Sequence, residues 1–226
     1  MYKRQVHLVG AGPGAADLIT VRGLKLLRSA DVVLHDRLVS PELLTEIRLD
    51  AEVVDVGKAP GEGGAGQGQI DALLVARAQA GFQVVRLKGG DPGLFGRSGE
   101  ELTACRAAGV PCLITPGVSS IFAAAAELGV PLTWRGLAQS VGIWTARTHD
   151  GELDENGLGR VAGADTLIVM MGRAALPEVI AALRNHGRAP ETPAACISAA
   201  KLACSMLRNS GSDRTSARSS GRISAP

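Results

Sequence analysis

GFQVVRLKGGDPGLFGRSG, residues 81–99, places a short apolar strand (84–87) directly before a turn of Gly89, Gly90, Asp91 and Pro92. Two adjacent glycines allow a close backbone approach to a ligand and positive φ, Asp91 adds an acceptor, and Pro92 stiffens the exit. In open α/β sheets small molecules bind at such strand ends. The stretch therefore predicts a ligand loop in an α/β fold, with an ordinary glycine-rich turn as the alternative.

Apolar strands alternate with helical stretches around this loop, which favours a largely parallel sheet. We expect strands at 5–9, 31–35, 84–87, 111–115, 141–146 and 166–171, and helices at 20–29, 70–80, 98–108, 119–128 and 177–185. The spacing of Ser98 and Glu101 predicts a capping box at the start of one helix. We divide the chain into an N-terminal α/β domain (1–133), an incomplete C-terminal α/β domain (134–204) and an irregular or disordered tail (205–226).

The composition is that of a globular protein, since 46% of the 226 residues are hydrophobic and 20% are charged. A net charge of +2 without a Lys/Arg block gives no indication of nucleic-acid binding. The four cysteines form no CxxC pair, so we expect buried thiols in a reducing compartment and no metal site. No apolar run reaches about 18 residues and no secretory leader is recognisable, so we expect a cytoplasmic protein without membrane contact.

The loop GAGPG, residues 10–14, follows the first expected strand. It departs from a dinucleotide fingerprint, because the third glycine falls one residue early and Pro13 occupies the turn. A nicotinamide oxidoreductase is therefore the weakest of the functions considered. A loop with Pro13 in the turn suits an adenosyl group better than a pyrophosphate.

A set of motifs in a fixed order is more specific than any one loop. The set comprises GAGPG (10–14), ADVVLHDRLVSPELL (30–44), VGK (56–58), VVRLKGGDP with LFGR (84–97), PGVSS (116–120), GVPLTWRGLAQS (129–140) and MMG (170–172). It resembles the uroporphyrinogen-III C-methyltransferases of the tetrapyrrole methylase family over residues 5–193. The resemblance implies two α/β domains with a cleft between them, a homodimer, and a tetrapyrrole substrate. It also implies S-adenosyl-L-methionine as methyl donor, S-adenosyl-L-homocysteine as product, and C-methylation of uroporphyrinogen III to precorrin-2 by way of precorrin-1.

The resemblance assigns one group of residues to the methyl donor: Pro13, Gly89, Gly90, Asp91, Leu94, Ser119, Ser120 and Met171. A donor pocket must fix both ends of the cofactor and hold the methyl carbon in line with the attacking atom. Met171 could instead be a buried core residue at the end of a strand. Ser119 and Ser120 could simply begin the following helix, because serine is a favoured N-cap.

The resemblance also assigns Asp36 as proton acceptor and Lys58 as proton donor. A base is reasonable because an alkylated pyrrole ring stays cationic until a proton leaves. Asp36 could instead cap a turn and pair with Arg37. Lys58 could be a solvated lysine or an anchor for a substrate carboxylate.

Uroporphyrinogen carries several carboxylates, so cations should gather at its site, where arginine binds carboxylates in bidentate fashion. The candidates for substrate binding are Arg37, Arg97, Arg135 and Arg147, each next to a motif loop. A surface arginine is the alternative for any one of them.

Departures from the family pattern leave other functions open. Gly93 replaces an aromatic residue and Ser98 a glycine, while the stretch from residue 205 onward lacks any helical or strand periodicity. A changed reading frame is one hypothesis for the tail. The alternatives are a catalytically impaired remnant that binds a tetrapyrrole or S-adenosylmethionine, and a later precorrin methylase.

Overall fold

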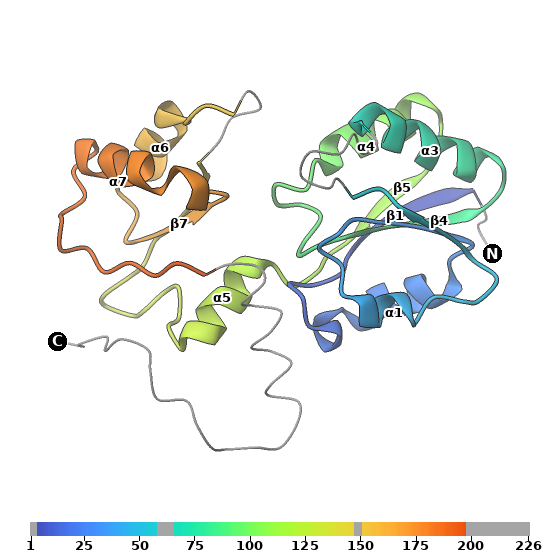
Figure 1. Cartoon of the computed structure of the whole chain (residues 1–226), viewed down its shortest axis with the longest axis horizontal. Helices are drawn as coiled ribbons and strands as arrows, with labels where there is room; N and C mark the ends of the chain where they lie inside the picture. The colour runs from blue at the N-terminus through green and yellow to red at the C-terminus, as the bar shows by residue number, and fades with distance from the viewer. Residues whose placement is uncertain (1–3, 58–65, 147–150, 198–226) are drawn as a thin grey trace, which may run out of the picture.

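The computed structural model describes residues 4–57, 66–146 and 151–197, and these form two α/β units (Figure 1). A five-stranded sheet has the order β3-β2-β4-β1-β5, and a two-stranded sheet pairs β6 with β7. Each strand pair is parallel. The strands are β1 (Gln5–Gly10), β2 (Val32–His35), β3 (Glu52–Asp55), β4 (Gln83–Lys88), β5 (Cys112–Thr115), β6 (Val141–Thr145) and β7 (Thr166–Met170).

Helices cover both faces of the five-stranded sheet (Figure 1). Over both units, the helices are α1 (Val21–Ser29), α2 (Pro41–Leu44), α3 (Gln67–Gln79), α4 (Ser98–Ala107), α5 (Ser120–Leu128), α6 (Glu155–Val161) and α7 (Leu176–Asn185), with 3₁₀ turns η1 (Ala16–Leu18) and η2 (Arg173–Ala175). None of these described helices is long and apolar enough to cross a membrane.

Successive side chains of the central strands point alternately to the two helix layers, as the two-residue period of a strand requires. On β4, Val84 packs in the cluster that holds Leu74 of α3, whereas Val85 and Leu87 pack in the cluster that holds Leu27 of α1. The next residues on the α3–α4 side of β4 are Arg86 and Lys88. Two cations therefore point into a buried layer.

The second unit has its own core, formed where α6 and α7 pack on one face of the β6–β7 sheet. Trp144 is its largest member, and the indole Nε1 donates to the Asp154 carbonyl at 3.1 Å. On the other face, Val141 and Ile143 are 36% and 39% exposed. The separate sheets and cores support our division at residue 133, which we retain as a proposal; the predicted tail (205–226) lies outside the described residues.

The predicted parallel α/β fold is confirmed, and the expected helices and strands lie within a few residues of their observed positions. The predicted capping box is wrong. Arg97, with a φ of 56°, precedes α4, and Ser98 is its first residue. The Ser98 hydroxyl donates to the Pro92 carbonyl at 2.6 Å, and the Glu101 carboxylate binds two buried cations instead of a backbone amide. The short helices α2 and α6 were not anticipated, because one or two turns give little periodicity.

Candidate active site

Three loops that follow β1, β4 and β5 meet at the carboxyl edge of the sheet. The amide of Gly90 donates to the Gly12 carbonyl at 2.7 Å, and the amide of Gly12 donates to the Gly90 carbonyl at 3.2 Å. A Cβ at Gly10 would lie 2.5 Å from the Gly117 Cα, closer than side-chain carbons approach backbone. The loops can meet only because glycine stands at these positions.

Asp91 ties two of these loops together. Its Oδ1 accepts from the Gly93 amide at 2.8 Å, and its Oδ2 accepts from the Gly117 amide at 2.9 Å. One carboxylate oxygen thus binds a backbone amide of its own loop, and the other binds a backbone amide of the loop after β5. The carboxylate can shape a donor pocket through these bonds, in addition to any ligand contact.

The amino end of α5 closes this group of loops. Ser119 is buried and is the N-cap of α5, where its hydroxyl accepts from the Ile121 amide at 3.4 Å. Its local role is therefore to begin this helix, which was the alternative to a role in donor binding. Gly90 has a φ of 71°, and a Cβ there would have Ser120 N, at 3.8 Å, as its nearest neighbour. A methyl group at Gly90 would therefore lie in ordinary van der Waals contact with the amino end of α5.

Asp36 lies directly after β2, two strands from β1 in the sheet. Its Oδ1 accepts from the Leu38 amide at 3.1 Å, and its Oδ2 is 3.6 Å from Nη2 of Arg86. The side chain is 25% exposed, which leaves the carboxylate accessible. The Leu38 contact is the turn cap that the alternative for Asp36 described, and the cation that faces the carboxylate is Arg86.

The end of β3 approaches the same place. A Cβ at Gly57 would lie 2.4 Å from the Cγ of Arg37, so Arg37 packs directly against this glycine. Lys58 follows Gly57 in the sequence but lies outside the described residues, as does Arg147.

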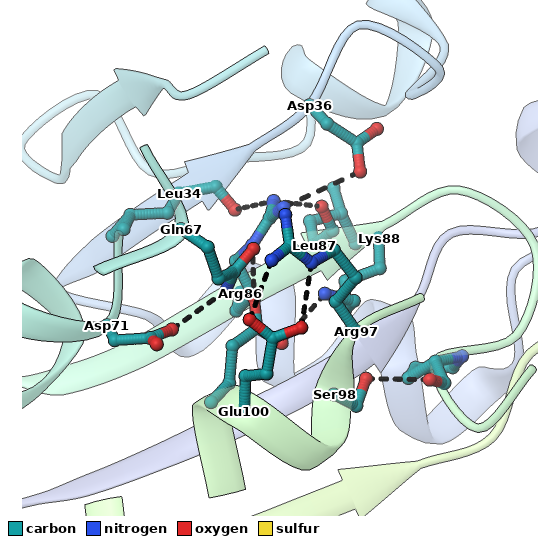
Figure 2. A network of polar contacts seen from close by, with 12 residues as sticks. Leu34, Asp36, Gln67, Asp71, Arg86, Leu87, Lys88, Arg97, Ser98 and Glu100 are labelled. Atoms are coloured by element: carbon teal, nitrogen blue, oxygen red, sulfur yellow. Dashed lines mark hydrogen bonds and ion pairs between the residues drawn. The ribbon is translucent and has the colours of Figure 1, made fainter. Parts of the chain in front are cut away.

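Sequence reasoning missed a buried ionic network beneath these loops (Figure 2). Glu101 of α4 is fully buried and binds Nε of Arg86 at 3.1 Å and Nζ of Lys88 at 2.7 Å. Burial lowers the pKa of the Lys88 ammonium, and the Glu101 carboxylate opposes this effect only in part. The signal available in the sequence was the pair of cations two residues apart on a central strand, which must share one face and find a counter-ion.

The remaining candidates are more dispersed. Arg97 makes a bidentate ion pair with Glu100, at 2.8 and 2.7 Å. Arg135 is exposed in the turn between Trp134 and Ala138. Pro13 and Leu94 are half-buried in their loops.

Met171 lies apart from these loops in the sequence, at the end of β7 in the second unit. It is 58% exposed with a φ of 55°. This left-handed conformation is uncommon outside glycine and clusters at functional sites. It is thus not the buried core residue that the alternative interpretation required.

No group of three or more His, Cys, Asp or Glu side chains that could hold a metal is found in the described ranges.

These features agree with the comparisons with known proteins. A model of the tetrapyrrole (corrin/porphyrin) methylases matches residues 5–203, and the chain belongs to this family. It is 50% identical over 193 residues to the siroheme synthase of Pseudomonas fluorescens (strain Pf0-1). That match covers 85% of this chain and 42% of the relative, so the chain spans less than half the length of that protein.

Solved structures of related enzymes share the fold. The native uroporphyrin III C-methyl transferase of Thermus thermophilus superposes with a TM-score of 0.72 at 40% identity, over 82% of this chain and 78% of that one. The same values hold for its complex with S-adenyl homocysteine. The cobalt precorrin-4 methyltransferase CbiF gives a TM-score of 0.72 at 29% identity, over 92% of this chain and 90% of that one. The predicted tetrapyrrole methylase fold is confirmed.

Proposed function

We propose that this chain transfers methyl groups from S-adenosyl-L-methionine to two pyrrole carbons of uroporphyrinogen III. The products would be precorrin-2, formed by way of precorrin-1, and S-adenosyl-L-homocysteine, in the biosynthesis of sirohaem or cobalamin. The observation that carries the proposal is the convergence of the three glycine loops beside a strand-end carboxylate. The similarity to the Thermus thermophilus enzyme in complex with S-adenyl homocysteine supports it.

The donor site in this proposal is the junction of the three loops around Gly90. Its borders are backbone groups and the amino end of α5, which suit the hydrogen-bonding ends of an amino acid and a ribose. The methyl donor would be held on one side by Gly89, Gly90 and Asp91. The other sides would be formed by Pro13, Leu94, Ser119 and Ser120, and by Met171 from the second unit. When bound, the sulfonium supplies an electrophilic methyl carbon: the pyrrole carbon forms the new C–C bond while the C–S bond breaks.

The protein's chemical task is then to remove a proton. Asp36 would accept the proton that leaves the methylated ring carbon, because its carboxylate is accessible, with one oxygen bound by the Leu38 amide and the other facing Arg86. Lys58 would act as proton donor.

We assign substrate carboxylates to Arg37, Arg97, Arg135 and Arg147. Arg97 would have to exchange Glu100 for a substrate carboxylate or bind it with its remaining donors, since a guanidinium carries five.

We also infer that the chain is a homodimer in the cytoplasm. Apolar Leu113, Ile114 and Phe122 are exposed among the described residues and offer area for a second copy to bury. Cys105 and Cys112 are free thiols, which suits a reducing compartment. Light scattering of the purified chain, and fractionation of the cells that make it, distinguish these assignments from a monomer or an exported protein.

The test is methyl incorporation from radiolabelled S-adenosyl-L-methionine into enzymatically generated uroporphyrinogen III. We expect a dimethylated product from the wild type and a loss of about 100-fold or more in Asp36→Ala, in the range of general-base contributions. Asp50→Ala is the matched control, because Asp50 forms an exposed pair with Arg48 and should leave the rate unchanged.

Two other outcomes would replace the proposal. Cofactor binding without any transfer would identify a binding remnant. Transfer to a later precorrin but not to uroporphyrinogen III would place the chain with enzymes that act later, such as the CbiF-like methyltransferases.

A further inference from the structure

Three charged side chains are buried together between β4 and α4, and their charges do not balance. Arg86 and Lys88 are 5% and 4% exposed, and both bind the single carboxylate of Glu101, which is 0% exposed. One carboxylate compensates one cation. Because an uncompensated buried charge is strongly unfavourable, a second carboxylate nearby stabilises these two cations. Asp36, whose Oδ2 is 3.6 Å from Arg86, provides it.

The guanidinium of Arg86 is fixed from three elements. Its Nε binds Glu101 of α4 at 3.1 Å, and Nη1 donates to the carbonyls of Leu87 on β4 at 3.1 Å and Leu34 on β2 at 3.5 Å. Nη2 is the nitrogen that faces Asp36 (Figure 2). Since the planar fork cannot turn one nitrogen without moving the others, the direction of Nη2 is set by the whole network.

Lys88 extends this network toward the ligand loops. A Cβ at Gly96 would lie 3.2 Å from the Lys88 Cε, so the lysine stem passes against the loop that follows Asp91. Its ammonium, 2.7 Å from Glu101, holds the same carboxylate that orients Arg86.

We infer that Arg86, itself held by Glu101 and Lys88, is the positioning residue that orients the Asp36 carboxylate for proton removal. The inference rests on the proposed function of Asp36. Arg86 touches neither the donor nor the substrate in this account; it acts through Asp36 by fixing one oxygen while the Leu38 amide fixes the other.

The first test is Arg86→Lys, which keeps a buried cation for Glu101 but has one nitrogen where three sets of contacts are needed. We expect kcat to fall roughly 10- to 100-fold, because misplacing a reacting group by about 1 Å can cost about 100-fold. The affinity for S-adenosyl-L-homocysteine and the KM for uroporphyrinogen III should stay unchanged. Arg77→Lys is the matched control, since Arg77 pairs with Glu52 on the surface.

The second test removes the network altogether, in case Arg86→Lys does not fold. The triple variant Arg86→Met, Lys88→Met, Glu101→Leu replaces buried charges by apolar groups, a change that proteins often tolerate or gain stability from. We expect it to fold, to bind S-adenosyl-L-homocysteine and to show the same loss of kcat.

A wild-type kcat in either folded variant would overturn the inference and leave the proposed function intact. A loss of S-adenosyl-L-homocysteine affinity by the same factor as kcat would also overturn it, because that pattern marks a structural role in the loops. Absence of transfer by the wild type would reject the proposed function, and the role of Arg86 with it.

Discussion

His7, on the inner strand β1, shows how a single polar residue can make this fold sensitive to pH. It is 6% exposed, and its Nε2 finds no partner among the described residues. Burial lowers the pKa of the imidazole, because the apolar surroundings disfavour the charged form. The neutral ring is therefore the form that fits the folded state.

The sign of the effect on stability follows from linkage. Below the ordinary histidine pKa of about 6.5 the unfolded chain binds a proton that the folded chain resists, so stability falls as pH decreases through this value. We predict that the free energy of unfolding of the wild type decreases between pH 7.5 and about 5.5. His7→Leu should reduce that decrease, measured by urea unfolding at several pH values. Equal slopes for both proteins would show that His7 does not contribute.

At the scale of elements, the junction between the Asp91 loop and α4 depends on Ser98. The hydroxyl is buried and donates to the Pro92 carbonyl at 2.6 Å, across the left-handed Arg97. Glycine at this position would leave that carbonyl without this donor. In this chain, Ser98 therefore fastens a loop that Gly93 makes more flexible.

We predict that Ser98→Gly destabilises the protein by about 1–2 kcal/mol, from the lost buried hydrogen bond and the lower helix propensity of glycine. The control on the same helix is Thr103→Ala, whose exposed hydroxyl donates to the Gly99 carbonyl and which should cost less. Thermal unfolding of the two variants measures the difference. A larger loss in Thr103→Ala would contradict the role given to Ser98.

The same junction shows why some elements could be predicted and others could not. The strand 84–87 and its glycine turn follow from local residue types, because apolar alternation and glycine have direct conformational meanings. The partner of Glu101 does not, since a Ser-x-x-Glu spacing fits a capping box and only the tertiary fold brings Arg86 and Lys88 beneath α4. Local signals predicted the element, and packing decided which contact its glutamate makes.

At the scale of the whole molecule, residues far apart in the sequence gather at one sheet edge. Gly12, Gly90 and Gly117 come from three loops and meet because β1 lies between β4 and β5. Motif order and family resemblance identified these loops, but not the contacts between them. The predicted cleft between the two domains remains a proposal, as does the donor role of Met171 on the second sheet.

The most direct test of this account is hydrogen–deuterium exchange of the full chain with and without S-adenosyl-L-homocysteine. We predict added protection of the amides in residues 10–14, 89–94 and 117–121, because these segments border the proposed donor site. The surface strand β3 should exchange as in the free protein. Protection confined to other segments, or none at saturating ligand, would contradict the claim that the three loops bind the methyl donor.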